Sequence, residues 1–528
     1  MNINESGAFY MENKTEIEFT RNTRCVQTYT DTSAEYVLPD YNGDVRKILY
    51  TSAEVRPSGR FAGGDEVECS GIVVYEIVYI DSENKLTSVT FTSDYDYSVK
   101  CSGESYRDSF AETTVSNYAI RLVGPRKIAA KASLVGNVAV VESGKATVEG
   151  DSFCGDENPE VQSRRFKIRR SLSSESRERE YAEMIARLDG AIADEVSVIS
   201  TYADAVAEEV SVGDGEVTVR GNLTLSAIIK NGDMPAYQRE KVVPFEESVP
   251  FPEAREGMFF VPEIQISSLT ATINASEIGT EVVVSAVLEY SVVGETNEEG
   301  EIVTDSYLKA CAVENGYEDF TYNELSSVIA SRETESGSVQ RADVEAEGIR
   351  EILFLKAAPK TESVVNEGGR LCVKGELKYS GIASAVDADG AIGYVPLRFS
   401  VPFERSFEVK SCDRPSFEVH VKSHNASATF DAAKLYATCT VEVNVVTCEE
   451  KHIKRLASSR RLADHKFEKS DSRIVIYYPD KSETLFSIAK KYKSTVGKIA
   501  SDNMLTADVM TDSDGNEMPI NVKKLLIY

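Results

Sequence analysis

Histidine and cysteine are the residue types in this chain best suited to binding a metal. Of four histidines, His420 and His424 share one face of an alternating segment, with Cys412 nearby. This set is half of a zinc site, but zinc sites normally take closer ligand pairs from two elements. The spacing therefore favours an ordinary surface strand, and we predict no metal and no other cofactor.

The motifs of the common enzyme classes are missing. The chain has no G-x-S-x-G nucleophile elbow, no G-x-x-x-x-G-K-[ST] phosphate loop and no Rossmann glycine set. In a chain with 86 acidic side chains, two neighbouring carboxylates do not indicate a general acid and base. We therefore predict that the protein is not an enzyme.

The charge balance limits the partners. The chain has 86 acidic and 58 basic side chains, which gives a formal net charge of −28. Affinity for nucleic acid comes mainly from Lys and Arg that displace counterions, so no nucleic-acid partner is expected. Hydrophobic residues make up 42% of the chain, which is the balance of folded protein.

Targeting signals are also missing. Residues 1–20 lack the apolar core of a secretion signal, and no run approaches the roughly 18 apolar residues of a membrane span. We expect no transmembrane segment and a protein made and kept in the cytoplasm. The nine cysteines contain no C-x-x-C, which indicates reduced thiols.

One β-rich pattern recurs three times at domain-sized intervals. Apolar residues alternate towards and past a central glycine at Gly71, Gly221 and Gly375. These glycines are 150 and 154 residues apart (71 to 221 and 221 to 375). A glycine inside a strand usually marks a bulge or a close backbone approach, so we expect it to shape a sheet and to hold no ligand.

The segments around each glycine repeat as well. Each copy has a preceding β-rich run (45–55, 196–206 and 349–358), a following aromatic residue (Phe91, Phe245 and Phe403) and a long closing run (128–141, 281–293 and 434–446). Alternation of period two with Gly, Asn and Asp turns is typical of half-buried antiparallel strands. The predicted fold is mainly β, with three repeated antiparallel β-sandwich-like modules.

Two segments between the modules suggest helices. Residues 176–193 carry apolar side chains at positions 181, 184, 185 and 188, a stripe of helical spacing. Residues 322–332 are a second, shorter candidate. Both helices would cover exposed sheet edges.

Residues 163–170 form a basic run in an acidic chain. This run either docks an acidic partner or an anionic membrane surface, or is a solvated strand that balances acidic neighbours. The basic stretch 451–461 has the same two interpretations.

The last 58 residues predict a strand–helix–helix–strand domain. A strand at 473–478 and a turn ending at Ser482, a candidate helix N-cap, precede a helix with Leu485 and Ile488 on one face. Thr495 caps a second helix, and residues 522–528 form the closing strand.

The segment from Glu483 to Tyr492 resembles the first-helix motif of LysM domains. That resemblance implies binding of N-acetylglucosamine-containing glycans such as peptidoglycan, in a groove between two loops. The groove residues it implies are Lys481, Ser482, Glu483, Thr484, Asn503, Met504 and Leu505. The family usually has Gly-Asp at 482–483, and the second loop (505–521) is long and acidic. The loops therefore form either a glycan groove or a protein-docking surface.

The repeats followed by one LysM domain resemble the SPOCS-domain proteins of endospore-forming Clostridia, whose best-known members are spore coat morphogenetic proteins. This resemblance implies a coat-assembly adaptor in the mother-cell cytoplasm, at the forespore surface, that docks the coat-basement ATPase. The alternative is a peptidoglycan-binding protein of the spore cortex or cell wall.

The repeats also give the expected division of the chain. The predicted parts are 1–160 (first module), 161–194 (basic segment and helical linker), 195–320 (second module), 321–450 (third module with a preceding short helix), 451–470 (linker) and 471–528 (LysM-like domain).

Overall fold

The computed structural model describes residues 16–63, 66–100, 106–147, 149–150, 159–344, 348–386, 390–467, 474–506, 511–512 and 516–528. Strands dominate these residues, and both α-helices lie near the C-terminal end. The prediction of a mainly β chain with a small helical region at its end is confirmed. Within the described residues, no helix is both long and apolar enough to cross a membrane.

Six sheets of three or four strands make up the main body, with orders β1-β6-β5, β2-β3-β4, β10-β11-β12, β13-β14-β8, β16-β17-β18 and β15-β20-β19. Strand β9 also pairs with β14, and the short β7 with β20. The strand bounds are β1 (Glu16–Val37), β2 (Val45–Gly63), β3 (Glu66–Asp81), β4 (Leu86–Lys100), β5 (Tyr106–Gly124), β6 (Lys127–Thr147), β7 (Glu149–Gly150), β8 (Glu160–Ser173), β9 (Arg177–Asp189), β10 (Val196–Val212), β11 (Glu216–Asn231), β12 (Tyr237–Pro250), β13 (Phe259–Ser276), β14 (Gly279–Tyr307), β15 (Cys311–Gln340), β16 (Ile349–Glu367), β17 (Arg370–Val386), β18 (Ile392–Glu408), β19 (Pro415–Phe430) and β20 (Lys434–Lys466). Two 3-10 turns, Ala193–Glu195 and Arg341–Val344, complete the body.

The sheets pack in pairs, and each pair encloses an apolar core. The first core joins the β2-β3-β4 sheet to the β1-β6-β5 sheet, with Tyr75 and Leu134 fully buried. The second is centred on β11 and β14, and the third on β17 and β20. Period-two alternation therefore places one face of each long strand inside a sandwich.

The three recurrent glycines occupy the central strands β3, β11 and β17, each at a bulge. Opposite Gly71, Gly221 and Gly375 the register of the neighbouring strand slips by one residue. A Cβ atom on any of these glycines would collide with that strand's backbone oxygen and with an aromatic ring. The predicted close backbone approach is confirmed.

The predicted alignment of the aromatic residues is wrong in the first copy. Tyr95, rather than Phe91, faces Gly71 across β3 and β4. In the other two copies the residues named, Phe245 and Phe403, face Gly221 and Gly375. Phe91 instead packs against Tyr36 and Tyr75 in the first core.

Both predicted helices are strands. Residues 177–189 form β9, which pairs with β14, and residues 322–332 lie inside β15. A bulge at Ile185 lets both Ile185 and Ala186 turn inward, and a second bulge at Ser326 interrupts β15. Because a bulge breaks the period of two, the apolar residues on its two sides mimic helical spacing.

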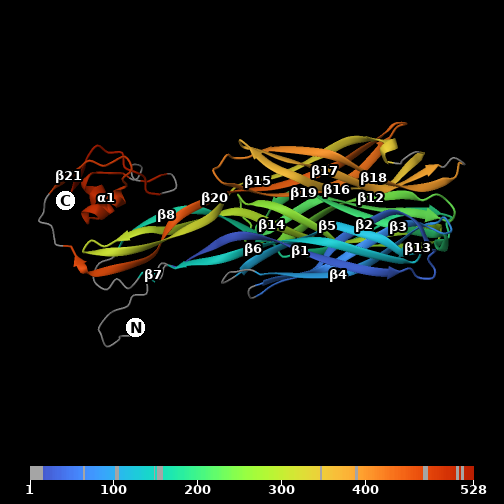
Figure 1. Cartoon of the computed structure of the whole chain (residues 1–528), viewed down its shortest axis with the longest axis horizontal. Helices are drawn as coiled ribbons and strands as arrows, with labels where there is room; N and C mark the ends of the chain where they lie inside the picture. Colours follow the sequence, from blue (N-terminus) through green and yellow to red (C-terminus); the bar gives the residue numbers. More distant parts are fainter. Residues whose placement is uncertain are drawn as a thin grey trace, which may run out of the picture.

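The expected linker at 451–470 is mostly strand, because β20 continues to Lys466. The C-terminal part of β20, together with parts of β8, β14 and β15, extends beyond the sandwiches (Figure 1). We call this extension (160–170, 295–307, 311–325 and 449–466) the stalk. Its core contains Phe166, Ile302, Phe320 and Ile453, which are all buried.

Three sheets from different pairs meet in a further apolar cluster, which we call the sandwich junction. Its members are Leu49, Tyr50, Val78, Ile80, Leu86, Ile199, Tyr202, Ile228, Ala236, Leu353, Phe354 and Ile382. Leu49, Ile199 and Leu353 are separated by the same 150 and 154 residues as the glycines (49 to 199 and 199 to 353). Corresponding positions of the three sandwiches therefore converge on one point.

Two polar contacts between the sandwiches involve histidines. His424 Nδ1 lies 2.8 Å from Asp204 Oδ1, and His420 Nδ1 lies 3.4 Å from Glu112 Oε2. Each pair joins β19 to a strand of another sandwich. The surface-strand interpretation of this segment is wrong for His424, whose side chain is only 12% exposed.

Candidate functional site

The small domain at the end of the stalk has the predicted strand–helix–helix–strand order. Strand β21 (Val475–Tyr477) pairs antiparallel with β22 (Leu525–Ile527), and helices α1 (Leu485–Tyr492) and α2 (Val496–Asp502) pack on them. Thr495 caps α2 as predicted. The cap of α1 is Thr484 rather than Ser482: its side chain accepts from the Ser487 N–H, and Ser487 Oγ accepts from the Thr484 N–H.

In the first loop, two predicted groove residues are engaged inside the domain. Thr484 is used by the helix cap. Glu483 accepts hydrogen bonds from the Tyr477 hydroxyl (2.7 Å) and the Asp480 N–H (3.0 Å). These donors lower the pKa of Glu483, and its backbone oxygen accepts from the Ile520 N–H. Glu483 therefore fixes the loop geometry as an anion.

In the second loop, Asn503 is also engaged. Its amide donates to the backbone oxygens of Ile499 (2.8 Å) and Leu526 (2.7 Å) and accepts from the Leu526 N–H (2.6 Å). Leu505 packs against the domain core. Both residues join the end of α2 to β22, so they set the shape of the loop.

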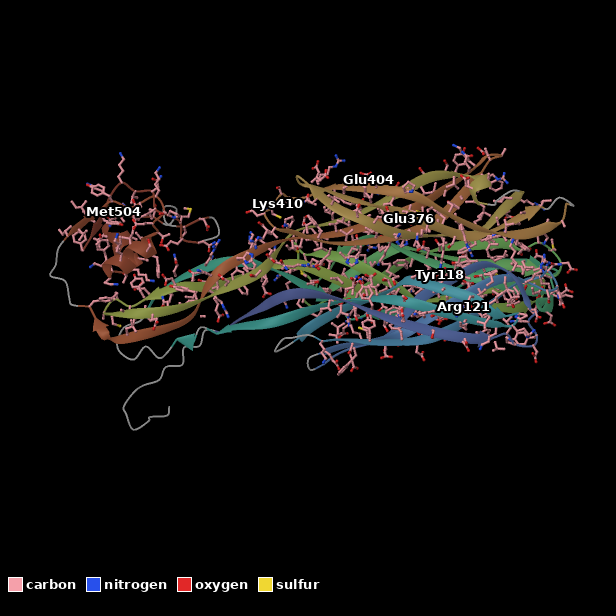
Figure 2. All side chains as sticks on the ribbon, viewed as in Figure 1. Tyr118, Arg121, Glu376, Glu404, Lys410 and Met504 are labelled. Carbon is pink, nitrogen blue, oxygen red and sulfur yellow. The ribbon has the colours of Figure 1, made fainter. Side chains whose placement is uncertain are left out.

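The remaining predicted groove residues are open to solvent. Lys481 and Ser482 are exposed on the first loop, and Met504 on the second is 91% exposed. Figure 2 shows Met504 on the small domain, at the opposite end of the molecule from the sandwiches. An ammonium, a hydroxyl and a polarizable thioether are therefore free to contact a ligand, with a rigid frame behind them.

Near its end, the second loop contacts the start of α1 through Glu517. The Phe486 N–H donates to Glu517 Oε1, and the other carboxylate oxygen of Glu517 accepts from Gln162 on the stalk. Asn516 Oδ1 accepts from the Arg165 N–H at 2.6 Å. The acidic composition of this loop was visible in the sequence, but its contact with β8 was not, because the two segments are about 350 residues apart.

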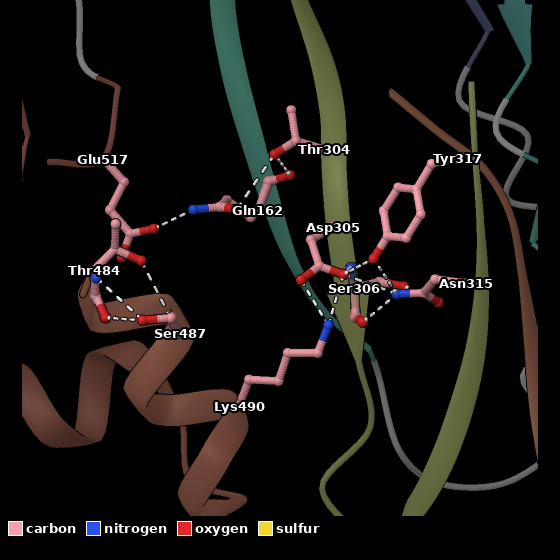
Figure 3. A network of polar contacts seen from close by, with 10 residues as sticks. All are labelled: Gln162, Thr304, Asp305, Ser306, Asn315, Tyr317, Thr484, Ser487, Lys490 and Glu517. Atoms are coloured by element: carbon pink, nitrogen blue, oxygen red, sulfur yellow. Dashed lines mark hydrogen bonds and ion pairs between the residues drawn. The ribbon is translucent and has the colours of Figure 1, made fainter. Parts of the chain in front are cut away.

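A compact set of contacts, which we call the latch, holds α1 against the stalk (Figure 3). Lys490 Nζ lies 2.6 and 2.8 Å from the two carboxylate oxygens of Asp305. The Tyr307 hydroxyl donates to the Ser494 backbone oxygen at 2.7 Å, and its ring meets Phe486 edge to face. Tyr307 is only 2% exposed and belongs to the core of the small domain.

The basic run 163–170 lies on β8 and is divided between two environments. Arg169 is buried and forms bidentate pairs with Glu295 and Glu418, which connects the second sandwich to the third. Arg165 and Lys167 face Glu301 and Glu299 across the strand pair and are exposed. Arg169 and Arg170 are thus paired with glutamates, whereas Arg164, Arg165 and Lys167 stay at the surface.

No cluster of three or more His, Cys, Asp or Glu that could hold a metal ion occurs among the residues that the structure describes. The six cysteines with described side chains are free thiols. Burial raises the pKa of the Cys448 thiol to about 11, so that this sulfur stays protonated beside Arg169.

Comparison with known proteins identifies one domain. Residues 481–509 match the family model of the LysM domain. This match covers the first loop, both helices and the start of the second loop. No curated protein and no solved structure matches the chain.

Proposed function

We propose that this chain is a non-catalytic glycan-binding protein whose LysM domain binds N-acetylglucosamine-containing glycan, such as peptidoglycan. The supporting observation is the LysM match at residues 481–509, together with three open side chains on the two groove loops. The sandwiches then serve as a rigid support that presents this domain at one end of the molecule.

The chemistry of the loops suits an uncharged sugar. N-acetylglucosamine offers hydroxyl and amide groups for hydrogen bonds and an apolar ring face and methyl group for contact. Ser482 and Lys481 supply polar partners, and Met504 supplies an adaptable apolar surface. Because Glu483, Thr484 and Asn503 already hold the loops in place, the loops lose little conformational freedom on binding.

Sedimentation of the intact chain with peptidoglycan sacculi tests this proposal. We expect micromolar binding that falls about tenfold in Met504→Asp, since removal of a contact residue at a small interface costs about 1–2 kcal/mol. Met234→Asp is the matched control, because Met234 is 61% exposed on a turn of the second sandwich. If the two variants sediment equally, the glycan does not bind at the LysM loops.

We propose the coat-assembly adaptor as a second candidate function. It is favoured by the equal spacing of the glycines and junction residues, which supports three copies of one sandwich, and by the resemblance of this arrangement to SPOCS-domain proteins. In this function the protein stays in the mother-cell cytoplasm, at the forespore surface, and docks the coat-basement ATPase. Several weak contacts along one chain would then add through effective concentration.

Co-sedimentation with purified, polymerised coat-basement ATPase tests the adaptor function. We expect the intact chain to pellet with the polymer, both with and without soluble peptidoglycan fragments. If the fragments release the chain, glycan and protein compete for the same loops. If the chain stays in the supernatant throughout, the adaptor function is excluded for this pair of proteins.

A further inference from the structure

Three basic side chains at the start of β8 are candidates for contact with a ligand. Arg164, Arg165 and Lys167 are exposed, and they form no ion pair within the part of the chain that the structure describes. Two residues further along the same strand, Arg169 and Arg170 are both paired with glutamates. Three free cations within four residues are unusual in a chain with a net charge of −28.

The part of β8 that carries these cations lies beside the second loop of the LysM domain, with Arg165 and Lys167 on one face of the sheet and Arg164 on the other. The backbone N–H of Arg165 donates to Asn516, and Gln162, two residues before Arg164, donates to Glu517. Both loop residues belong to the segment between α2 and β22. The stalk therefore continues the surface of the LysM loops, and the latch fixes the domain in this position.

Three acids near this strand accept hydrogen bonds within the fold, and Glu299, which faces Lys167 across the β8–β14 pair, forms no ion pair with it. The Glu517 carboxylate accepts from the Phe486 N–H and from Gln162, and Glu301 accepts from the Ser163 hydroxyl. Asp512 accepts from the Asn516 N–H at 2.8 Å. These carboxylates keep their charge, but none of them forms an ion pair with Arg164, Arg165 or Lys167, so the three cations are open to a ligand.

We propose that the stalk strand β8 and the LysM loops form one composite site for a carboxylate-bearing glycan, in which Arg164, Arg165 and Lys167 take the carboxylates. This inference rests on the proposed function and narrows its ligand class. Arginine matches a carboxylate with two parallel N–H groups, whereas a neutral N-acetylglucosamine oligomer offers no such partner. Peptidoglycan strands carry carboxylates on their peptides and on any lactyl group that lacks a peptide, and chitin oligomers carry none.

The magnitude of the preference follows from the exposure of the cations. Exposed ion pairs are individually weak, so three cations together should give about a tenfold preference for the charged ligand, which corresponds to about 1.4 kcal/mol. Such pairs are screened at high ionic strength. Affinity for the charged glycan should therefore fall with added salt, and affinity for the neutral oligomer should not.

The test uses the intact chain and three probes: a chitin oligosaccharide, a soluble peptidoglycan fragment with free carboxylates, and the same fragment after amidation. We expect the triple variant Arg164→Gln, Arg165→Gln, Lys167→Gln to lose about tenfold in affinity for the free fragment. Its affinity for the other two probes should stay within about twofold.

A matched control has the same change in charge at a distance from the LysM domain. Arg121→Gln, Arg239→Gln, Lys410→Gln alters three exposed cations of the sandwiches; Figure 2 shows Arg121 and Lys410 there. We expect this control to bind all probes like the unmodified chain. An equal loss for charged and neutral probes in the β8 variant, or no loss for either, would overturn the composite site. If the unmodified chain binds none of the probes, the proposed function itself fails, and the composite site fails with it.

Discussion

The sandwich junction and the latch hold parts of one chain together by different means. The junction buries large apolar side chains, with Ile228, Leu353 and Ile382 fully enclosed. The latch has one buried aromatic residue, one hydrogen bond and one ion pair whose side chains are 35% and 22% exposed. Each fully buried aliphatic side chain contributes about 1.5–3 kcal/mol. The sandwiches should therefore behave as one rigid body, and the LysM domain should be the part that detaches first.

The largest expected effect is at the junction. Ile228→Ala should lower the free energy of unfolding by about 2–5 kcal/mol, because it opens a cavity where three sandwiches meet. Denaturant titration measures the change. Ile192→Ala is the matched control, because Ile192 is 61% exposed, and it should change stability by less than about 0.5 kcal/mol. An equally small change for Ile228→Ala would mean that the sandwiches do not depend on the junction.

The second effect concerns the pH dependence of the junction. Glu76 accepts a hydrogen bond from Ser200 of the next sandwich, and burial raises the pKa of Glu76 to about 7. Between pH 4.5 and 7 the folded chain holds a proton that the unfolded chain has released. The free energy of unfolding therefore falls as the pH rises through this window, by about 3 kcal/mol in total.

Glu76→Gln removes this titration and keeps the hydrogen-bonding shape. The loss of stability between pH 5 and pH 8 should then be smaller in the variant than in the unmodified chain, by about 2–3 kcal/mol. Denaturant titration at the two pH values checks this. Identical pH profiles would show that Glu76 is not buried at the junction.

At the latch, the expected effects are smaller. Tyr307→Phe keeps the contact with Phe486 but removes the hydrogen bond to Ser494, which should weaken docking by about 1 kcal/mol. The Arg165 amide, which is protected by Asn516 only when the LysM domain is docked, should exchange about fivefold faster with deuterium. Tyr41→Phe is the control, since Tyr41 is 86% exposed. Unchanged protection would mean that the hydrogen bond does not hold the domain.

The smallest effect is expected for the ion pair of the latch. Lys490→Met retains the aliphatic length and removes the charge opposite Asp305, so docking should weaken by less than about 1 kcal/mol. High salt should have the same effect on the unmodified chain and none on the variant. A loss as large as that of Ile228→Ala would erase the distinction between the junction and the latch.

The sequence predicted the local structure better than the contacts between distant parts. Alternation located the long strands around each glycine, and the helical stripe from Leu485 located α1. The helix predicted at 176–193 was wrong because a bulge at Ile185 imitates helical spacing. Pairing with β14 makes this segment a strand. The prediction of a linker was wrong at 451–466, because the many charges there obscure Ile453 and Leu456, which are buried residues of a continuing strand.

For the candidate site, the sequence located the loops but not the role of each residue. Lys481, Ser482 and Met504 lie in exposed loops, and their part in a groove stays a prediction. It did not reveal that Asn503 and Glu483 are engaged in the domain, because hydrogen bonds to β22 and Tyr477 depend on the folded geometry. The contacts of Asp305, Tyr307 and Arg165 with the LysM domain join segments up to about 350 residues apart. No local pattern records such pairs.

The central claim is that the two LysM loops bind N-acetylglucosamine-containing glycan. The most direct measurement is methyl NMR of the intact chain, labelled on its eight methionines, during titration with a chitin oligosaccharide. We expect the Met504 methyl signal to shift with the oligosaccharide concentration, while that of Met234, on the second sandwich, stays in place. A titration that leaves Met504 unmoved, or that moves both signals alike, would contradict the central claim.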